Sequence, residues 1–111
     1  MKLNPTKVSF THPTQFTDGT PFGAADYAGT EFAVREVGSA NWVPTVAVPV
    51  SFGDGTGEVP LSQLDLPPVV ELELSARTVA ANGSVSDWAA SSESFKFDVR
   101  VPNSPLALSV A

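Results

Sequence analysis

Residues 69–79 alternate apolar and polar side chains with a period of two. Successive side chains of a β-strand point to opposite faces, so this pattern predicts a half-buried antiparallel strand. Turn residues flank it on both sides, at 66–68 and at 81–83. A strand with one apolar face needs a second layer to cover that face, which constrains the whole chain. The predicted inner positions are Leu72, Leu74, Ala76 and Thr78, and the outer positions are Glu71, Glu73, Ser75 and Arg77.

Further segments carry the same alternation. Residues 7–11, 27–37, 58–61 and 94–101 are predicted strands, with Phe95, Phe97 and Val99 on the inner face of the last one. The apolar stretch 42–52 contains Pro44 and Pro49, whose nitrogens cannot donate a hydrogen bond to a neighbouring strand. We therefore predict that it is either an edge strand or a kinked connection. Ten prolines and eight glycines punctuate the chain, and only residues 24–26 suit a helical turn. Six or seven short strands predict an all-β sandwich.

The composition narrows the class of protein and of partner. The chain has 111 residues, the length of one domain, and 42% of them are hydrophobic, which is typical of a folded core. A net charge of −6 argues against nucleic acid and against anionic membranes as partners. With no cysteine, disulfides and thiolate metal sites are excluded. No segment has the roughly 18 apolar residues of a membrane span, and Met1 starts no signal-like stretch, so we expect synthesis in a cytoplasm.

Three blocks resemble one family. Val8-Ser9-Phe10-Thr11-x-Pro13, residues 17–21 and residues 27–34 are similar to the second and third strands of bacterial and phage fibronectin type III domains. Residues 66–83 resemble the sixth strand of that family, and residues 95–101 resemble the last one. The resemblance implies an immunoglobulin-like antiparallel β-sandwich of six to seven strands over residues 7–101. Two positions depart from the family, because Phe10 replaces its core tryptophan and Leu72 replaces its corner tyrosine.

The segments outside this region are short. Residues 1–6 form a predicted N-terminal arm, too short for the usual first strand of the family. That strand is then short, absent or supplied by a neighbouring chain, which would leave a sheet edge open until a partner covers it. Residues 102–111 form a predicted apolar C-terminal tail.

Little in the sequence indicates catalysis. His12 is the only histidine and has no partner at metal-ligand spacing, so it is predicted to be structural or exposed. The loop 53–58 holds too few carboxylates for calcium and lacks the lysine of a phosphate loop, so it is predicted to be a hairpin turn. Glu71 and Glu73 are predicted to be solvated, with Arg77 balancing their charge. We therefore expect a non-enzymatic protein with no catalytic residue, no metal and no cofactor.

The two tryptophans, Trp42 and Trp88, lie beside predicted turns, where large aromatic side chains can anchor a protein interface or stack on a sugar ring. Stacking on Arg77 is the alternative for Trp88, and it is favoured because tryptophan is usually largely buried. For Trp42 both interpretations stay open. The other candidate partner-binding residues are Asp54 in the loop and Leu106 and Leu108 in the tail.

Two function classes follow. The first is a structural or interaction protein, most simply a phage virion component such as a capsid decoration or tail-associated protein, made in the host cytoplasm. Its partner would be a larger protein assembly, with a homo-oligomer as one form. The alternative is a secreted or surface-exposed adhesion module that binds a carbohydrate or a cell surface through the tryptophans and residues 53–57.

Overall fold

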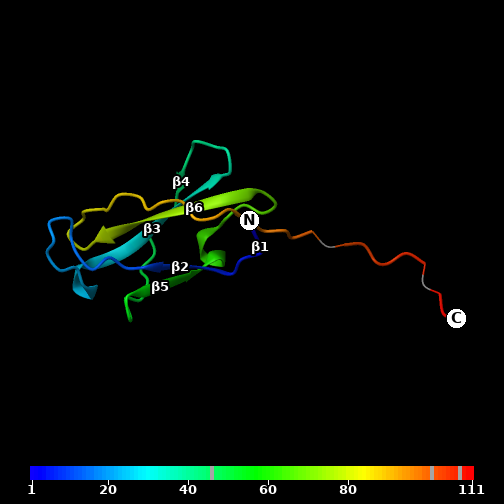
Figure 1. The fold of residues 1–111 in the computed structure, drawn as a ribbon, viewed down its shortest axis with the longest axis horizontal. Coiled ribbons are helices and arrows are strands. Elements are labelled where there is room, and N and C mark those ends of the chain that lie inside the picture. The colour runs from blue at the N-terminus through cyan, green and yellow to red at the C-terminus, as the bar shows by residue number, and fades with distance from the viewer. Residues whose placement is uncertain (46, 101, 108) are drawn as a thin grey trace.

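A computed structural model describes residues 1–45, 47–100, 102–107 and 109–111. Within these residues the chain forms seven strands and two single-turn 3₁₀ helices (Figure 1). In chain order they are β1 (Lys2–Leu3), β2 (Lys7–Thr11), η1 (Ala24–Asp26), β3 (Tyr27–Glu36), β4 (Val43–Pro44), β5 (Thr56–Pro60), η2 (Leu61–Leu64), β6 (Glu71–Ala80) and β7 (Phe95–Lys96).

The strands form two sheets, so the predicted all-β, two-layer arrangement is confirmed. One sheet has the order β1-β7-β6-β3-β4, and the other consists of β2 and β5 (Figure 1). All pairs are antiparallel except β1 with β7, which makes the larger sheet mixed. The first strand, expected to be short or absent, is a two-residue strand that pairs with β7 rather than with β2. None of the described residues forms a helix long and apolar enough to cross a membrane.

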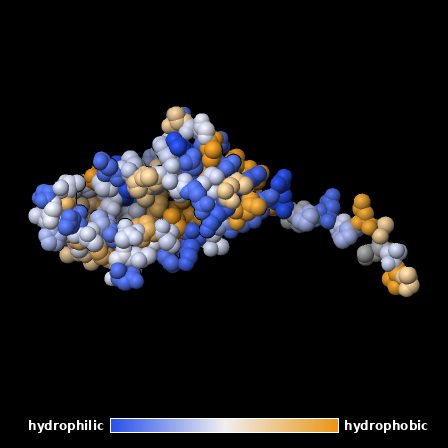
Figure 2. All heavy atoms as spheres, in the orientation of Figure 1, coloured by the Kyte–Doolittle hydropathy of each residue, from blue (hydrophilic) through white to orange (hydrophobic). Residues whose placement is uncertain are grey.

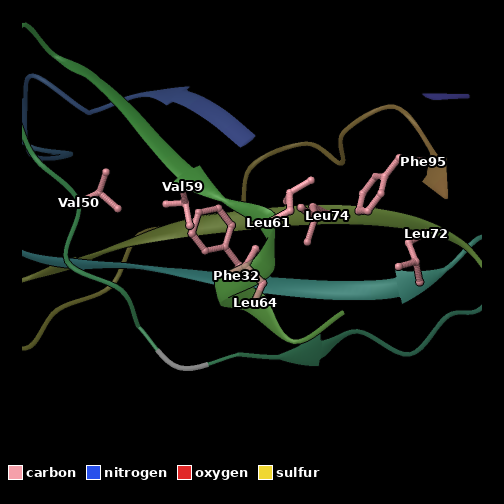
Figure 3. Close-up of a cluster of buried hydrophobic side chains, with 8 residues drawn as sticks. All are labelled: Phe32, Val50, Val59, Leu61, Leu64, Leu72, Leu74 and Phe95. Atoms are coloured by element: carbon pink, nitrogen blue, oxygen red, sulfur yellow. The ribbon is translucent and has the colours of Figure 1, made fainter. Parts of the chain in front are cut away.

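The long strands β3 and β6 pair along nearly their whole length, which confirms the two strongest alternation signals. Their inner faces carry Phe32, Leu72 and Leu74, all buried. Val59 of β5 and Phe95 of β7 meet them in the core (Figure 3). Removing each such side chain from water contributes about 1.5–3 kcal/mol, so this cluster is the main source of stability.

Two residues of η2 also enter the core, which the sequence did not predict. Leu61, expected to end a strand, instead begins the helix, and it is buried together with Leu64 (Figure 3). In a strand, residues 61 and 64 would point to opposite faces of the sheet. The helical turn instead places both leucines on the same side, where they enter the core.

The last strand is shorter than predicted. Only Phe95–Lys96 pairs with β6, and Val99 is 64% exposed rather than buried. Regular pairing ends where Lys96 faces Glu71, the first residue of β6, and beyond it Val69 N–H donates to the Phe97 carbonyl at 2.8 Å. Val101, also expected in this strand, lies outside the described residues.

Beyond β7, Arg100 donates hydrogen bonds to Asp98, which hold the pKa of that carboxyl well below its usual range.

The segment between β3 and β5 crosses from one sheet to the other. Val43–Pro44 pairs with β3 at the sheet edge, and an isolated bridge joins Thr30 to Val48, so of the two predicted alternatives the edge strand is present, over two residues. The turn at residues 53–55 is also confirmed. The prediction of a hairpin there was wrong, because β5 pairs with β2 and not with the segment before the turn.

Candidate functional site: a tryptophan–arginine face

The outer face of the β3–β6 pair carries two ion pairs in register. Glu31 lies opposite Arg77, and Arg35 lies opposite Glu73. Arg77 Nη2 donates to Glu31 Oε1 at 3.1 Å, and Arg35 Nη2 lies 3.6 Å from Glu73 Oε1. Opposite charges directly across an antiparallel pair stabilise it, here on half-buried side chains.

These pairs correct two predictions about charge. Glu73 is not solvated, since its side chain is only 17% exposed and lies against Arg35. Arg77 balances Glu31 of the neighbouring strand rather than Glu71 or Glu73 of its own. The reason is the register: Glu31 lies directly opposite Arg77 across the two strands, whereas Glu73 and Glu71 lie four and six positions away along the same strand.

An indole ring covers each arginine. The guanidinium carbon of Arg35 lies 4.4 Å from the ring centroid of Trp42, and that of Arg77 lies 4.6 Å from the ring centroid of Trp88. The predicted stacking of Trp88 on Arg77 is thereby confirmed, and Trp42 makes the equivalent contact. Such cation–π contacts contribute about 0.5–1 kcal/mol each at exposed sites.

The two tryptophans reach the face from opposite flanks. Trp42 precedes β4, which pairs with β3, whereas Trp88 belongs to residues 84–92, which run beside β6. Backbone hydrogen bonds tie this second segment to β6, among them Ala89 N–H to the Ala76 carbonyl at 2.8 Å. The structure thus places residues 84–92 along the strand rather than away from the sheet.

Serine hydroxyls complete the attachment of residues 84–92. The Ser86 and Ser92 hydroxyls accept hydrogen bonds from the backbone N–H groups of Thr78 and Leu74, at 2.9 and 3.0 Å. The Ser75 hydroxyl donates to the Ala89 carbonyl at 2.7 Å. Residues 84–92 are too irregular to supply the regular backbone hydrogen bonds of a strand. Because backbone N–H and C=O groups still need partners, the serine hydroxyls take the place of some of the missing backbone groups. They hold Trp88 in place over β6.

A hollow of about 400 Å³ lies between the two indoles. It exists because Ala33 and Ser75, directly opposite each other in the register, are small. We call this surface the tryptophan–arginine face. It comprises Glu31, Ala33, Arg35, Trp42, Glu73, Ser75, Arg77 and Trp88.

The face suits binding. Trp88 remains 40% exposed and Trp42 is half-buried, so both rings can contact another molecule as well as their arginines. The Nε atoms of Arg35 and Arg77 are buried and, like Nδ1 of His12, have no hydrogen-bond partner among the described residues, so the exposed indoles are the part of this face that a partner can reach. Aromatic and arginine side chains on a rigid two-strand base are typical of interface anchors.

The other predicted partner-binding residues lie elsewhere. Asp54 is exposed in the turn before β5, where its carboxylate accepts a hydrogen bond from Thr56 N–H at 3.1 Å, and it does not line the hollow. Leu106 is 91% exposed in the tail. Leu108 lies outside the described residues. The structure therefore brings together Trp42 and Trp88 but neither Asp54 nor Leu106.

His12 is buried and structural. Its Nε2 lies 3.0 Å from the Ser51 carbonyl, and its ring stacks on Phe52 with centroids 4.4 Å apart. Tyr27 and Phe10 pack edge-on against it. In the part of the chain that the structure describes, no three His, Asp or Glu side chains gather as a metal site would require.

Sequence reasoning missed Glu31 and Arg35 as members of the face. The available signal was their position on the outer side of a predicted strand, but their partners depend on the β3–β6 register. No family model, no curated protein and no solved structure matches the chain.

Proposed function

We propose that the chain is a non-enzymatic interaction domain that docks on a larger protein assembly through the tryptophan–arginine face. The observation that carries the proposal is the convergence of Trp42 and Trp88, 46 positions apart in the sequence, on one hollow. Tryptophan and arginine dominate the binding energy of protein interfaces when they lie in a small packed centre. The burial of His12 among aromatic rings supports a role without catalysis.

The strand pairing supports a domain of the immunoglobulin-like, fibronectin type III class. That architecture pairs its second and fifth strands in one sheet and its third, sixth and seventh strands in the other. Here β2 pairs with β5, and β3, β6 and β7 are neighbours. The fold by itself assigns no activity, because this sandwich serves many unrelated functions.

A phage virion component, such as a capsid decoration or tail-associated protein, is the assembly role we favour. The acidic charge of −6 keeps a domain soluble and suits one that is added to the outside of a particle. Quantitative mass spectrometry of purified capsids and tails from the encoding phage tests this. The proposal predicts a fixed, stoichiometric copy number in one of the two fractions. Particles that contain no peptide of this chain would refute it.

A carbohydrate-binding adhesion role is the second candidate, and the hollow between the indoles favours it. Sugar rings stack on exposed indole faces, and Trp42 and Trp88 both line the hollow. This role predicts location at a cell surface or outside the cell.

A glycan array separates the two candidates. It compares the wild type with Trp42→Ala and Trp88→Ala, and with Trp42→Phe as the control that keeps an aromatic platform. Binding that is lost in both alanine variants and kept in the phenylalanine variant supports the carbohydrate role. Absence of binding by the wild type, or binding that is equal in all four proteins, removes it.

A further inference from the structure

The strand β2 has an open edge. Its only partner among the described residues is β5. His12 N–H bonds the Gly55 carbonyl and Leu61 N–H bonds the Thr6 carbonyl at the two ends of this pair. In an antiparallel pair the hydrogen-bonding residues alternate, so Val8 and Phe10 point their backbone groups at β5. The backbone groups of Lys7, Ser9 and Thr11 consequently face outward, which is an edge that folded proteins normally cover.

A groove runs beside this edge. It has a volume of about 560 Å³ and lies between β2 and the residues that lead into β7. Leu61, Leu74 and Phe95 of the core line it, so the gap between the two sheets opens onto apolar side chains (Figure 3). We call it the β2 groove. Its rim charges are already balanced, since Lys7 bonds Glu58 at 2.9 Å and Lys2 lies 3.8 Å from Glu93.

The C-terminal tail has the pattern of a strand that lacks a sheet. Leu106, Leu108 and Val110 alternate with Ala107, Ser109 and Ala111, and no charged side chain follows Arg100. Leu106 and Val110 are 91% and 99% exposed.

Figures 1 and 2 show the tail leaving the sandwich, with hydrophobic residues along it. The radius of gyration is 18.6 Å, compared with about 13 Å for a compact chain of this length. Exposed apolar residues in such an arrangement mark a site of interaction.

We propose that residues 104–111 of one copy occupy the β2 groove of a second copy and add a strand to β2. The added backbone would bond the outward groups of Lys7, Ser9 and Thr11, and every second side chain would lie on the apolar floor. Eight extended residues span about 26 Å, and the five residues of β2 span about 16 Å, so the segment is long enough. A neutral segment also suits a groove whose rim charges are paired.

The orientation of the tail favours a second copy over the same chain. The tail leaves the sandwich beside the N-terminus of the chain and runs away from β2 (Figure 1). To fill its own groove it would have to reverse and lie parallel to β2. A tail from another copy can enter antiparallel, which is the more stable pairing. Because the donor and acceptor surfaces differ, the contact is head-to-tail and leads to rings or filaments.

Directed disulfide formation tests the contact, because the chain has no cysteine of its own. One protein carries Ser9→Cys at the groove and another carries Ser109→Cys in the tail. The proposal predicts an interchain disulfide when the two are mixed and oxidised. The matched control, Ala40→Cys in the exposed turn before β4, should give at least about tenfold less product with the tail variant. Equal product with Ser9→Cys and Ala40→Cys would overturn the proposal.

Sedimentation of the full chain and of a chain lacking residues 102–111 provides the second test. The full chain should gain mass with concentration, and the truncated chain should stay monomeric with an unchanged circular dichroism spectrum. A synthetic peptide of residues 102–111 should then bind the truncated chain saturably, and a peptide with Leu106→Asp and Val110→Asp should not.

Three results would refute the second-copy arrangement. The full chain could remain a monomer up to about 500 µM, well above an ordinary micromolar dissociation constant. The truncated chain could fail to bind the wild-type peptide. A single chain carrying both Ser9→Cys and Ser109→Cys could close an internal disulfide at low concentration. The tryptophan–arginine face has no part in these measurements, so their failure would leave the proposed docking function standing.

Discussion

Gly57 should not tolerate alanine, because Phe10 occupies the space of its side chain. Gly57 lies directly opposite Phe10 in the β2–β5 pair. A Cβ atom at Gly57 would lie 2.5 Å and 2.8 Å from two ring carbons of Phe10. The ring would have to retreat by roughly an ångström, and it packs against Phe32 in the core with centroids 5.9 Å apart.

Overpacking of this kind destabilises a folded protein by about 1–3 kcal/mol. Alanine also lowers the conformational entropy of the unfolded chain relative to glycine, which offsets about 0.4–1 kcal/mol of that loss. We therefore expect Gly57→Ala to lower the free energy of unfolding by about 1–2 kcal/mol. Equilibrium urea unfolding, followed by the fluorescence of Trp42 and Trp88, measures this. The midpoint should fall while the m-value stays constant.

Two variants make the reasoning refutable. Gly23→Ala is the matched control, since its Cβ would meet nothing within 4 Å, and it should be neutral or slightly stabilising. Phe10→Leu should reduce the cost of Gly57→Ala, with a favourable coupling of about 1 kcal/mol in a double-mutant cycle. A Gly57→Ala protein as stable as the wild type, or a cost unchanged in the Phe10→Leu background, would show that the two residues do not meet in this way.

Three further predictions concern local contacts. Ser92→Ala should lower the free energy of unfolding by about 1 kcal/mol, because the Ser92 hydroxyl accepts a part-buried hydrogen bond from Leu74 N–H. Ser86→Ala should lower it by less, because the hydrogen bond from Thr78 N–H to Ser86 is exposed. The midpoints of urea unfolding measure the difference between the two variants. His12→Ala should cost about 3 kcal/mol through the cavity it leaves among aromatic rings, and a loss below about 1 kcal/mol would contradict its burial. Hydrogen bonds from Thr20 lower the pKa of Asp18. The ionised carboxylate therefore stabilises the fold at pH values above its ordinary pKa, and this stabilisation is lost as the pH falls through the lowered pKa. In an NMR titration, Thr20→Val should raise the pKa of Asp18.

The alternation of side chains was sufficient to predict the layers of the fold. Leu72 and Leu74 were placed on the inner face of β6 from the sequence, and both are buried. The error at the end of the chain has a physical cause that alternation does not encode. Val69 has φ of +67°, which interrupts the extended chain before β6, so beyond Lys96 regular pairing gives way to a hydrogen bond from Val69 N–H to the Phe97 carbonyl.

The candidate site was predictable only in part. The stacking of Trp88 on Arg77 followed from proximity to a strand, and it is present. The meeting of Trp88 with Trp42 did not follow, because it depends on which strands are neighbours and on the attachment of residues 84–92 along β6. The position of Arg35 opposite Glu73 likewise required the register, which local sequence does not fix.

The proposed function requires the tryptophan–arginine face to dock the domain on its assembly. The most direct measurement is competitive incorporation into purified particles, with the wild type, a Trp42→Ala/Trp88→Ala variant and a Val85→Ala control quantified by mass spectrometry. Val85 is 49% exposed and does not line the hollow, so its variant should load as the wild type does. The double variant, checked as folded by circular dichroism, should load at least about tenfold less. Equal loading of all three proteins would contradict this docking role.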